Sequence, residues 1–205
     1  MYDCIIIGAG PSGMMCAISA SQNGNKVLLL EKNNILGKKM RLTGGTRCNI
    51  TNLKENEQFI QNLPTKNGRF LHSSLNNFGP YNIYQFFTKL GVKLKEEDNN
   101  RIFPVSDKAL DFIDAMHKEL IKLNVEIKLN TEVIDVKKDN EFIITTTSNI
   151  YYARNIVIAT GGLSYPHTGS TGFGYEFAEK FNHTVTELFP TESPIISHDD
   201  VIISK

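Results

Sequence analysis

The 205-residue chain has no excess of charge, because 22 lysine and arginine residues balance 22 aspartate and glutamate residues. Proteins that bind nucleic acid or anionic membranes usually carry a basic surplus. We therefore expect no nucleic acid and no membrane as partner. The composition leaves the oligomeric state open.

Long apolar runs are absent as well. The longest ones have the length of a β-strand, whereas a transmembrane helix needs about 20 consecutive apolar residues. The first residues read as a strand and show neither the basic segment nor the cleavage site of a signal peptide. Together these absences predict a cytoplasmic protein.

Cysteine is scarce, and Cys4, Cys16 and Cys48 form neither a C-x-x-C pair nor a zinc-binding pattern. The histidines also lack the spacing of metal ligands, so no metal site is predicted. An odd number of unpaired thiols is typical of a reducing compartment. Cys4 and Cys16 lie in apolar segments and are expected to be inert core residues.

A glycine-rich turn at residues 8–13 is the most informative stretch that the sequence does contain. It follows an apolar strand and opens an apolar helix, and its glycines have the G-x-G-x-x-G spacing of a dinucleotide fingerprint. Gly8 permits the sharp turn, Gly10 lets a pyrophosphate approach the backbone, and Gly13 lets the helix pack against the strand. The helix N-terminus then offers unpaired N–H groups and a positive dipole to phosphates.

A second apolar strand at residues 26–31 completes a β-α-β unit and ends in Glu31. An acid at this point of a dinucleotide fold accepts hydrogen bonds from ribose hydroxyls. The alternative is an ordinary β-α-β unit with a glycine turn and a solvent-facing glutamate. Because strand, turn, helix, strand and acid all occur in order, we favour dinucleotide binding.

Residues 32–52 form a long basic loop directly after this acid. Long irregular connections inside a domain are usually functional. Gly44 and Gly45 would let the backbone approach a flat ligand, and Arg47 and Asn49 would donate hydrogen bonds to it. The alternative is a solvated surface loop.

The remaining chain predicts the other elements of an α/β domain. Residues 53–91 look mainly helical, a hairpin surrounds the turn at 98–100, and Ser106 is expected to cap an amphipathic helix. The strands that we predict from apolar runs and alternation are 125–129, 131–137, 141–147, 149–153, a buried strand at 155–160, 184–189 and fragments at 195–203. The last buried strand breaks at Gly161-Gly162, and a second glycine-rich turn at 169–174 leads into a helix.

Three stretches together resemble the YhiN/BaiN-like flavoproteins of the two-dinucleotide-binding-domain superfamily, also labelled aminoacetone-oxidase-like, one branch of which reduces bile-acid double bonds. These stretches are KMRLTGGTRCNITN at 39–52, RIFPVS at 101–106 and GLSYPHTGSTG at 162–172. The resemblance implies a Rossmann-like FAD/NAD(P)-binding α/β fold, with a central parallel sheet, a crossover antiparallel β-meander and helices on the sheet faces.

Family members are about twice as long as this chain, so the resemblance also implies a truncated domain layout. Residues 1–190 would form the FAD-binding domain, with a helical and hairpin insertion at about 53–105. Residues 191–205 would begin an inserted β-rich domain.

What the resemblance implies for the site is FAD bound in an extended form. The amides of Gly10, Ser12 and Gly13 would hold the pyrophosphate, Glu31 and Lys32 the ribose end, and the Val133 backbone the adenine edge. Further residues would line the path to the reactive ring or form its floor. The full set of expected cofactor residues is Gly8, Gly10, Ser12, Gly13, Glu31, Lys32, Lys39, Thr43, Arg47, Cys48, Asn49, Val133, Ala159, Thr160 and Gly161.

The implied function is an FAD-dependent oxidoreductase that passes hydride or electrons between NAD(P)H and a small-molecule acceptor. The catalytic residues stay open. Cys48 beside Arg47 is a candidate thiol, although we favour a packing or flavin-contact role, and His167 is a candidate acid or base. Three alternatives remain: a flavin-binding module without turnover, an NAD(P)-only dehydrogenase and a tRNA-modifying flavoprotein.

Overall fold

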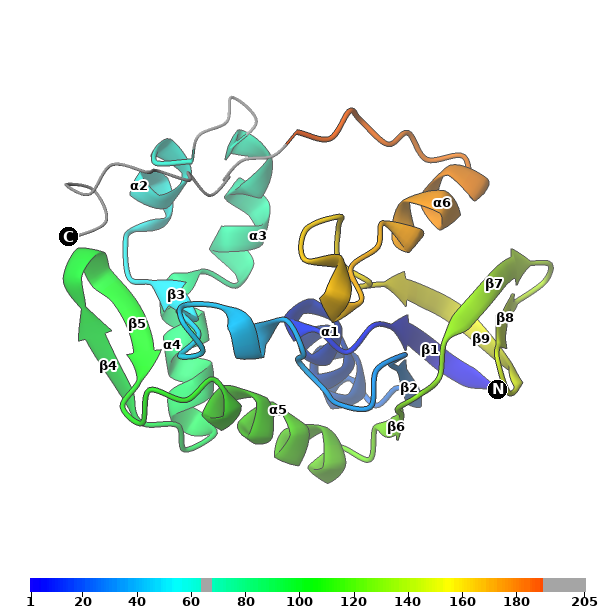
Figure 1. Cartoon of the computed structure of the whole chain (residues 1–205), viewed down its shortest axis with the longest axis horizontal. Coiled ribbons are helices and arrows are strands. Elements are labelled where there is room, and N and C mark those ends of the chain that lie inside the picture. Colours follow the sequence, from blue (N-terminus) through cyan, green and yellow to red (C-terminus); the bar gives the residue numbers. More distant parts are fainter. Residues whose placement is uncertain (64–67, 190–205) are drawn as a thin grey trace, which may run out of the picture.

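Six strands form one mixed sheet at the centre of the computed structural model, which describes residues 1–63 and 68–189 (Figure 1). The strand order is β6-β2-β1-β9-β8-β7. The central pairs β6–β2, β2–β1 and β1–β9 are parallel, while β9–β8 and β8–β7 are antiparallel. The strands are β1 (Tyr2–Ile7), β2 (Val27–Leu30), β6 (Glu126–Lys128), β7 (Val133–Lys138), β8 (Phe142–Thr146) and β9 (Ile150–Ile158). The predicted α/β fold with a parallel centre and an antiparallel meander is confirmed.

The first β-α-β unit forms as predicted. Helix α1 (Pro11–Gln22) follows β1 after the glycine turn, with Gly10 as N-cap and Pro11 in its first position. Proline suits that position because the first N–H of a helix has no intrahelical acceptor. Gly24, at φ +80°, ends the helix and returns the chain to β2.

The two faces of the sheet are covered differently, because successive side chains of a strand point to opposite faces. Ile6 and Leu29 pack in the cluster that contains the buried sides of α1 and α5 (Leu110–Lys122). Ile5 and Leu28 pack in the other cluster with apolar residues of β7 and β8 and with α6 (Phe173–Lys180). Burial on both faces explains why β1 and β2 read as continuous apolar runs.

Residues 51–104 build a smaller unit beside this sheet (Figure 1). Its three-stranded sheet has the order β3-β5-β4, and the antiparallel pair β4–β5 is the predicted hairpin. Its elements are β3 (Thr51–Asn52), α2 (Asn56–Gln61), the 3₁₀ turn η2 (Gly68–Leu71), α3 (His72–Asn77), α4 (Pro80–Lys89), β4 (Leu94–Glu97), η3 (Asp98–Asn100) and β5 (Arg101–Pro104). The predicted helical character of residues 53–91 is confirmed within the described residues.

The predicted cap of α5 is wrong. The helix begins at Leu110, and Ser106 lies before it with its hydroxyl donating to Asp111 (2.6 Å) and accepting from the Lys108 N–H (3.2 Å). Asp107 adopts φ +57°, which interrupts helical geometry between Ser106 and the first turn. The Ala109 N–H is bound by the Thr46 carbonyl of the basic loop instead of by a cap.

The segments predicted as two strands at 149–153 and 155–160 are one strand, β9. Ala153 pairs with Phe142 of β8 on one side and with Tyr2 of β1 on the other. The strand continues through Arg154 because Asn155 remains paired with Cys4 of β1, and the exposed Arg154 side chain forms an ion pair with Asp3. The second half of the strand is half-exposed instead of buried.

The predicted strand at 184–189 is also wrong, since residues 183–189 have no regular secondary structure. The predicted fragments at 195–203, and the β-rich segment expected at 191–205, lie outside the described residues. No helix in the described part of the chain combines the length and the apolar character needed to cross a membrane.

Candidate functional site

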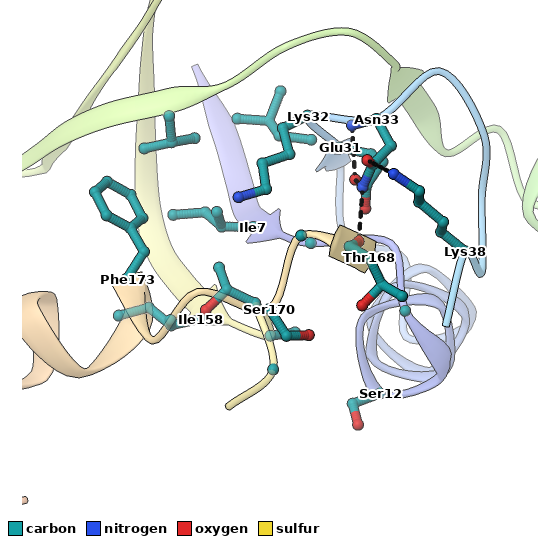
Figure 2. Close-up of a pocket in the computed structure, with 18 of the residues that line it drawn as sticks. Ile7, Ser12, Glu31, Lys32, Asn33, Lys38, Ile158, Thr168, Ser170 and Phe173 are labelled. Atoms are coloured by element: carbon teal, nitrogen blue, oxygen red, sulfur yellow. Dashed lines mark hydrogen bonds between the residues drawn. The ribbon is translucent and has the colours of Figure 1, made fainter. Parts of the chain in front are cut away.

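A cavity of about 510 Å³ lies where the carboxyl ends of β1, β2 and β9 meet (Figure 2). In the sheet, β2 lies on one side of β1 and β9 lies on the other side of it. The strand order therefore reverses direction at β1, and the cavity lies at this topological switch point of the parallel sheet. Ligands of open α/β sheets bind in this crevice. The lining includes the glycine turn, residues 31–33, 38–39, 131–133, 157–161, 168–170 and Phe173.

The three fingerprint glycines have three different surroundings. A Cβ on Gly13 would lie 1.9 Å from the Gly8 carbonyl oxygen, and a Cβ on Gly8 (φ +103°) would lie 2.5 Å from the Ala159 carbonyl oxygen. These two glycines therefore let α1, β1 and the end of β9 approach one another. A Cβ on Gly10 would meet no atom within 4 Å. Gly10 thus leaves open space in front of the first-turn N–H groups of α1, which have no intrahelical acceptors.

Glu31 is buried at the end of β2, with 8% of its surface exposed. One carboxylate oxygen accepts from the Ala9 N–H (2.8 Å), and the other accepts from the N–H (2.8 Å) and the side-chain amide (2.6 Å) of Asn33. A carboxylate offers about four acceptor positions. The three internal bonds fix the orientation of the group and leave it able to accept a bond from a ligand.

Two lysines place positive charge at the cavity. Lys32 extends along the cavity above Ile7, as Figure 2 shows. The Lys39 ammonium donates to the Ser164 carbonyl (2.7 Å) beside Gly161, and partial burial lowers the pKa of Lys39. Both cations suit a ligand with negative charge along its length.

Most of the predicted cofactor residues are brought together at this cavity. Those that line it are Gly8, Gly10, Ser12, Glu31, Lys32, Lys39, Val133, Ala159, Thr160 and Gly161. Gly13 lies directly behind Gly8. The residues Thr43, Arg47, Cys48 and Asn49 are not part of the lining.

The side chain of Arg47 is occupied by contacts with the β4–β5 hairpin and with Asp107. It pairs with Glu97 (2.8 Å) and Asp107 (3.3 Å), and its guanidinium lies 4.2 Å from the centroid of the Phe103 ring. Lys95 pairs with the same two acids, so the four charges form one network. The expected hydrogen bonds from Arg47 to a flat ligand are therefore not formed in this arrangement.

Cys48 and Asn49 are also turned toward the protein. Cys48 is buried, and this burial raises the pKa of its thiol despite a hydrogen bond with Thr43. The Asn49 amide is oriented so that it donates to the carbonyls of Thr51 (2.9 Å) and Ile102 (3.3 Å). A raised pKa disfavours the reactive thiolate, which agrees with the packing role that we favoured for Cys48.

His167 is exposed and lies outside the lining of the cavity. Its ring packs against Tyr165, with centroids 5.8 Å apart. It belongs to the short 3₁₀ turn η4 (Pro166–Thr168) in the second glycine-rich segment. Nothing in this position prepares it as an acid or base for a ligand in the cavity.

Several lining residues were missed by sequence reasoning, namely Asn33, Thr131, Thr168, Ser170 and Phe173. The second glycine-rich turn did signal a backbone that approaches another group closely. Asn33 was missed because one of its acceptors, the Thr168 carbonyl, lies 135 residues away in the sequence. Among the described residues, no group of three histidine, cysteine, aspartate or glutamate side chains is placed to hold a metal ion.

Comparison with known proteins identifies relatives over nearly the whole chain. The family model of the HI0933-like protein Rossmann domain matches residues 2–191. The chain is 35% identical to the ribosomal RNA dihydrouridine synthase of Escherichia coli (strain K12), over 95% of this chain and 47% of that protein. It is 30% identical to the 3-dehydro-bile acid delta(4,6)-reductase of Clostridium scindens, over 90% of this chain and 45% of that protein. The chain thus spans about half the length of the curated relatives it matches.

Solved structures show the same fold at low sequence identity. The 3-ketosteroid-delta4-(5alpha)-dehydrogenase from Rhodococcus jostii RHA1 aligns with a TM-score of 0.62 at 16% identity, covering 80% of this chain and 46% of that one. The open conformation of a flavocytochrome c3 fumarate reductase aligns with a TM-score of 0.60 at 17% identity, covering 87% and 40%. These likenesses establish the fold alone.

Proposed function

Because the chain belongs to the family of the HI0933-like protein Rossmann domain, we propose that it binds FAD and contributes the nucleotide-binding half of a flavin-dependent oxidoreductase. One observation carries the proposal. The cavity joins a helix N-terminus fronted by open space at Gly10 to a buried carboxylate, Glu31, that retains acceptor capacity. This is the pair of groups that a nucleoside diphosphate needs.

The residues at the cavity fit the adenosine diphosphate part of FAD. The N–H groups of Ser12 and Gly13 would hold the pyrophosphate, and Glu31 would accept a hydrogen bond from a ribose hydroxyl. The backbone at Val133, on the far side of the cavity, would meet the adenine edge. Lys39 and residues 159–161 would lie along the cofactor beyond the pyrophosphate. When bound, FAD would supply hydride chemistry to a substrate.

The reaction that we propose is the reduction of a carbon–carbon double bond conjugated to a carbonyl group. One relative is named for forming dihydrouridine, which carries two more hydrogens than uridine across a ring double bond. Another is named a bile acid delta(4,6)-reductase. In the balanced reaction, NAD(P)H gives a hydride and solvent gives a proton, so that the double bond is saturated and NAD(P)⁺ is formed. NAD(P)H enters as the source of electrons for the flavin.

A small unsaturated carbonyl compound is the substrate class that we favour, because the chain has no basic surplus. Uridine in RNA is the second candidate, and the name of the 35% identical relative favours it. The two candidates differ in their dependence on salt, since contacts with RNA phosphates weaken steeply as salt rises.

The visible absorbance spectrum of the purified chain tests the proposal. We expect bound flavin, and bleaching on addition of NADH or NADPH under nitrogen. Reoxidation is then followed with a steroid enone and, separately, with an RNA that contains uridine. A chain that binds neither FAD nor ADP would overturn the proposal. Colourless protein that binds and turns over NAD(P)⁺ would support an NAD(P)-only dehydrogenase, and bound flavin that does not bleach would support a module without turnover.

A further inference from the structure

Residues 163–171, which we call the strap, connect the glycine pair after β9 to the turn before α6 and cross the cavity toward β2. Thr168, Gly169 and Ser170 line the cavity, and the side chains of Thr168 and Ser170 are buried. Leu163 and Tyr165 of the same segment are exposed. The strap therefore has an inner side that faces the proposed ligand and an outer side that faces solvent.

Two hydrogen bonds hold the strap against the loop that follows β2. Side chains of that loop donate both of them. The Asn33 amide donates to the Thr168 carbonyl (3.2 Å), and the Lys39 ammonium donates to the Ser164 carbonyl (2.7 Å). Gly169, at φ +104°, brings its backbone against the same loop, because a Cβ there would lie 3.0 Å from the Asn33 amide nitrogen. Asn33 thus supplies one of the two hydrogen bonds that hold the strap, together with a close contact at Gly169.

Asn33 holds the ribose acid at the same time. Its backbone N–H and its side-chain amide both donate to one oxygen of Glu31 (2.8 and 2.6 Å). Lys38 donates to the side-chain amide oxygen (Oδ1) of Asn33 (2.9 Å), which turns the side-chain amide nitrogen (Nδ2) toward its two acceptors, Glu31 and Thr168 (Figure 2). A single amide therefore connects the basic loop, the acid at the end of β2 and the strap.

We infer that Asn33 is the positioning residue for the adenosine end of the site, which it prepares by orienting Glu31 and by latching the strap. The inference rests on the proposed function only in that a ligand with an adenosine diphosphate part occupies the cavity. Asn33 acts through Glu31 and Thr168 and is not itself a catalytic residue. Asn33 acts at the adenosine end of the cavity. It therefore affects the binding of ADP and FAD, which contain adenosine, and does not affect the binding of FMN, which lacks it.

The test compares Asn33→Ala, Asn33→Asp and the control Asn34→Ala, whose side chain is an exposed asparagine next in sequence. Dissociation constants are measured for FAD, ADP and FMN, and hydrogen exchange of amides 163–172 is measured without ligand. We expect Asn33→Ala to weaken the binding of FAD and ADP about tenfold, since one hydrogen-bonded amide is lost. The dissociation constant of FMN should not change. Exchange in the strap should rise in the same variant, and Asn34→Ala should match the parent protein.

Asn33→Asp separates positioning from packing. Aspartate has the shape of asparagine, but it places an acceptor against the Glu31 carboxylate and the Thr168 carbonyl. We expect Asn33→Asp to weaken the binding of ADP at least as much as Asn33→Ala does. Parent-like ADP affinity in Asn33→Asp, or unchanged strap exchange in both variants, would overturn the inference. If the parent chain binds neither FAD nor ADP, the proposed function fails, whereas strap exchange still tests the latch.

Discussion

Substitutions at two glycines of the turn at residues 8–13 should distinguish an effect on ligand binding from an effect on stability. A valine at Gly10 places its side chain in open space, and the backbone there (φ −74°) is ordinary for any residue. We expect Gly10→Val to keep its stability within about 0.5 kcal/mol of the parent and to lose FAD binding, because the side chain fills the pyrophosphate position. Chemical denaturation and flavin fluorescence measure the two effects.

Gly13→Ala is the contrasting variant. Its added Cβ would lie 1.9 Å from the Gly8 carbonyl oxygen, a backbone atom that cannot rotate away. We expect a loss of about 3 kcal/mol in the free energy of unfolding, as for other overpacked sites. A stable Gly13→Ala protein would show that Gly13 is not needed for close packing against Gly8, and a Gly10→Val protein that still binds FAD would show that Gly10 does not make room for the pyrophosphate.

The pKa values of the three thiols lead to a second prediction for single residues. Burial raises the pKa of Cys4 to about 11, and it also raises the pKa of Cys16 and of Cys48. Since the thiolate is the form that reacts, alkylation by iodoacetamide at pH 8 should be slow in the native protein at all three positions. Mass spectrometry after timed labelling measures the rates, with urea-unfolded protein as the reference. Rapid labelling of Cys48 alone would favour a redox role over packing.

At the scale of elements, the charge network of Arg47, Lys95, Glu97 and Asp107 joins the basic loop to the β4–β5 hairpin. Hydrogen bonds from Lys95 and Arg47 hold the pKa of Asp107 below its usual value. The stabilisation from this carboxylate is therefore complete above its unfolded pKa of about 3.9 and is lost as pH falls through the lower folded pKa.

Asp107→Asn tests this linkage. We expect the variant to have a lower Tm than the parent at pH 6 to 7, and the difference should shrink steadily below about pH 4. High salt should also reduce the difference, because the network is partly exposed. Scanning calorimetry between pH 3 and 7 gives both Tm values. A difference independent of pH would mean that the charge of Asp107 does not stabilise the fold.

At the scale of the whole molecule, a ligand in the cavity contacts the ends of β1, β2 and β9 together, so its binding should stabilise the entire sheet. At a concentration of 100 times the dissociation constant, FAD should add about 2.7 kcal/mol to the free energy of unfolding. For a chain of this size that corresponds to a rise in Tm of about 5–10 °C. ADP at the same ratio should give the same rise. Thermal unfolding with and without each nucleotide measures it, and no rise with either would exclude binding at this cavity.

The part of the fold that could be predicted from the sequence is the part that local patterns encode. The strand, glycine turn, helix, strand and Glu31 follow one another within 31 residues, and they adopt the arrangement that their spacing predicts. The hairpin at 94–104 and the meander were predicted for the same reason, since turn residues and alternation act over a few positions. Where a local signal misled, as in the predicted cap at Ser106, an acceptor distant in the sequence, the Thr46 carbonyl, binds the Ala109 N–H before α5.

The partners of the polar side chains at and around the site were decided only by tertiary structure. The sequence by itself placed Arg47 and Asn49 on a loop near a ligand, but Glu97, Asp107 and the carbonyl of Ile102 occupy their polar groups in the folded chain. It likewise could not bring Asn33 to Thr168, because that contact requires β9 to lie beside β1 and the strap to return over β2. Local spacing determines backbone geometry, whereas the partner of a polar side chain is determined by which distant segments the packing of the sheet brings within 3 Å or so.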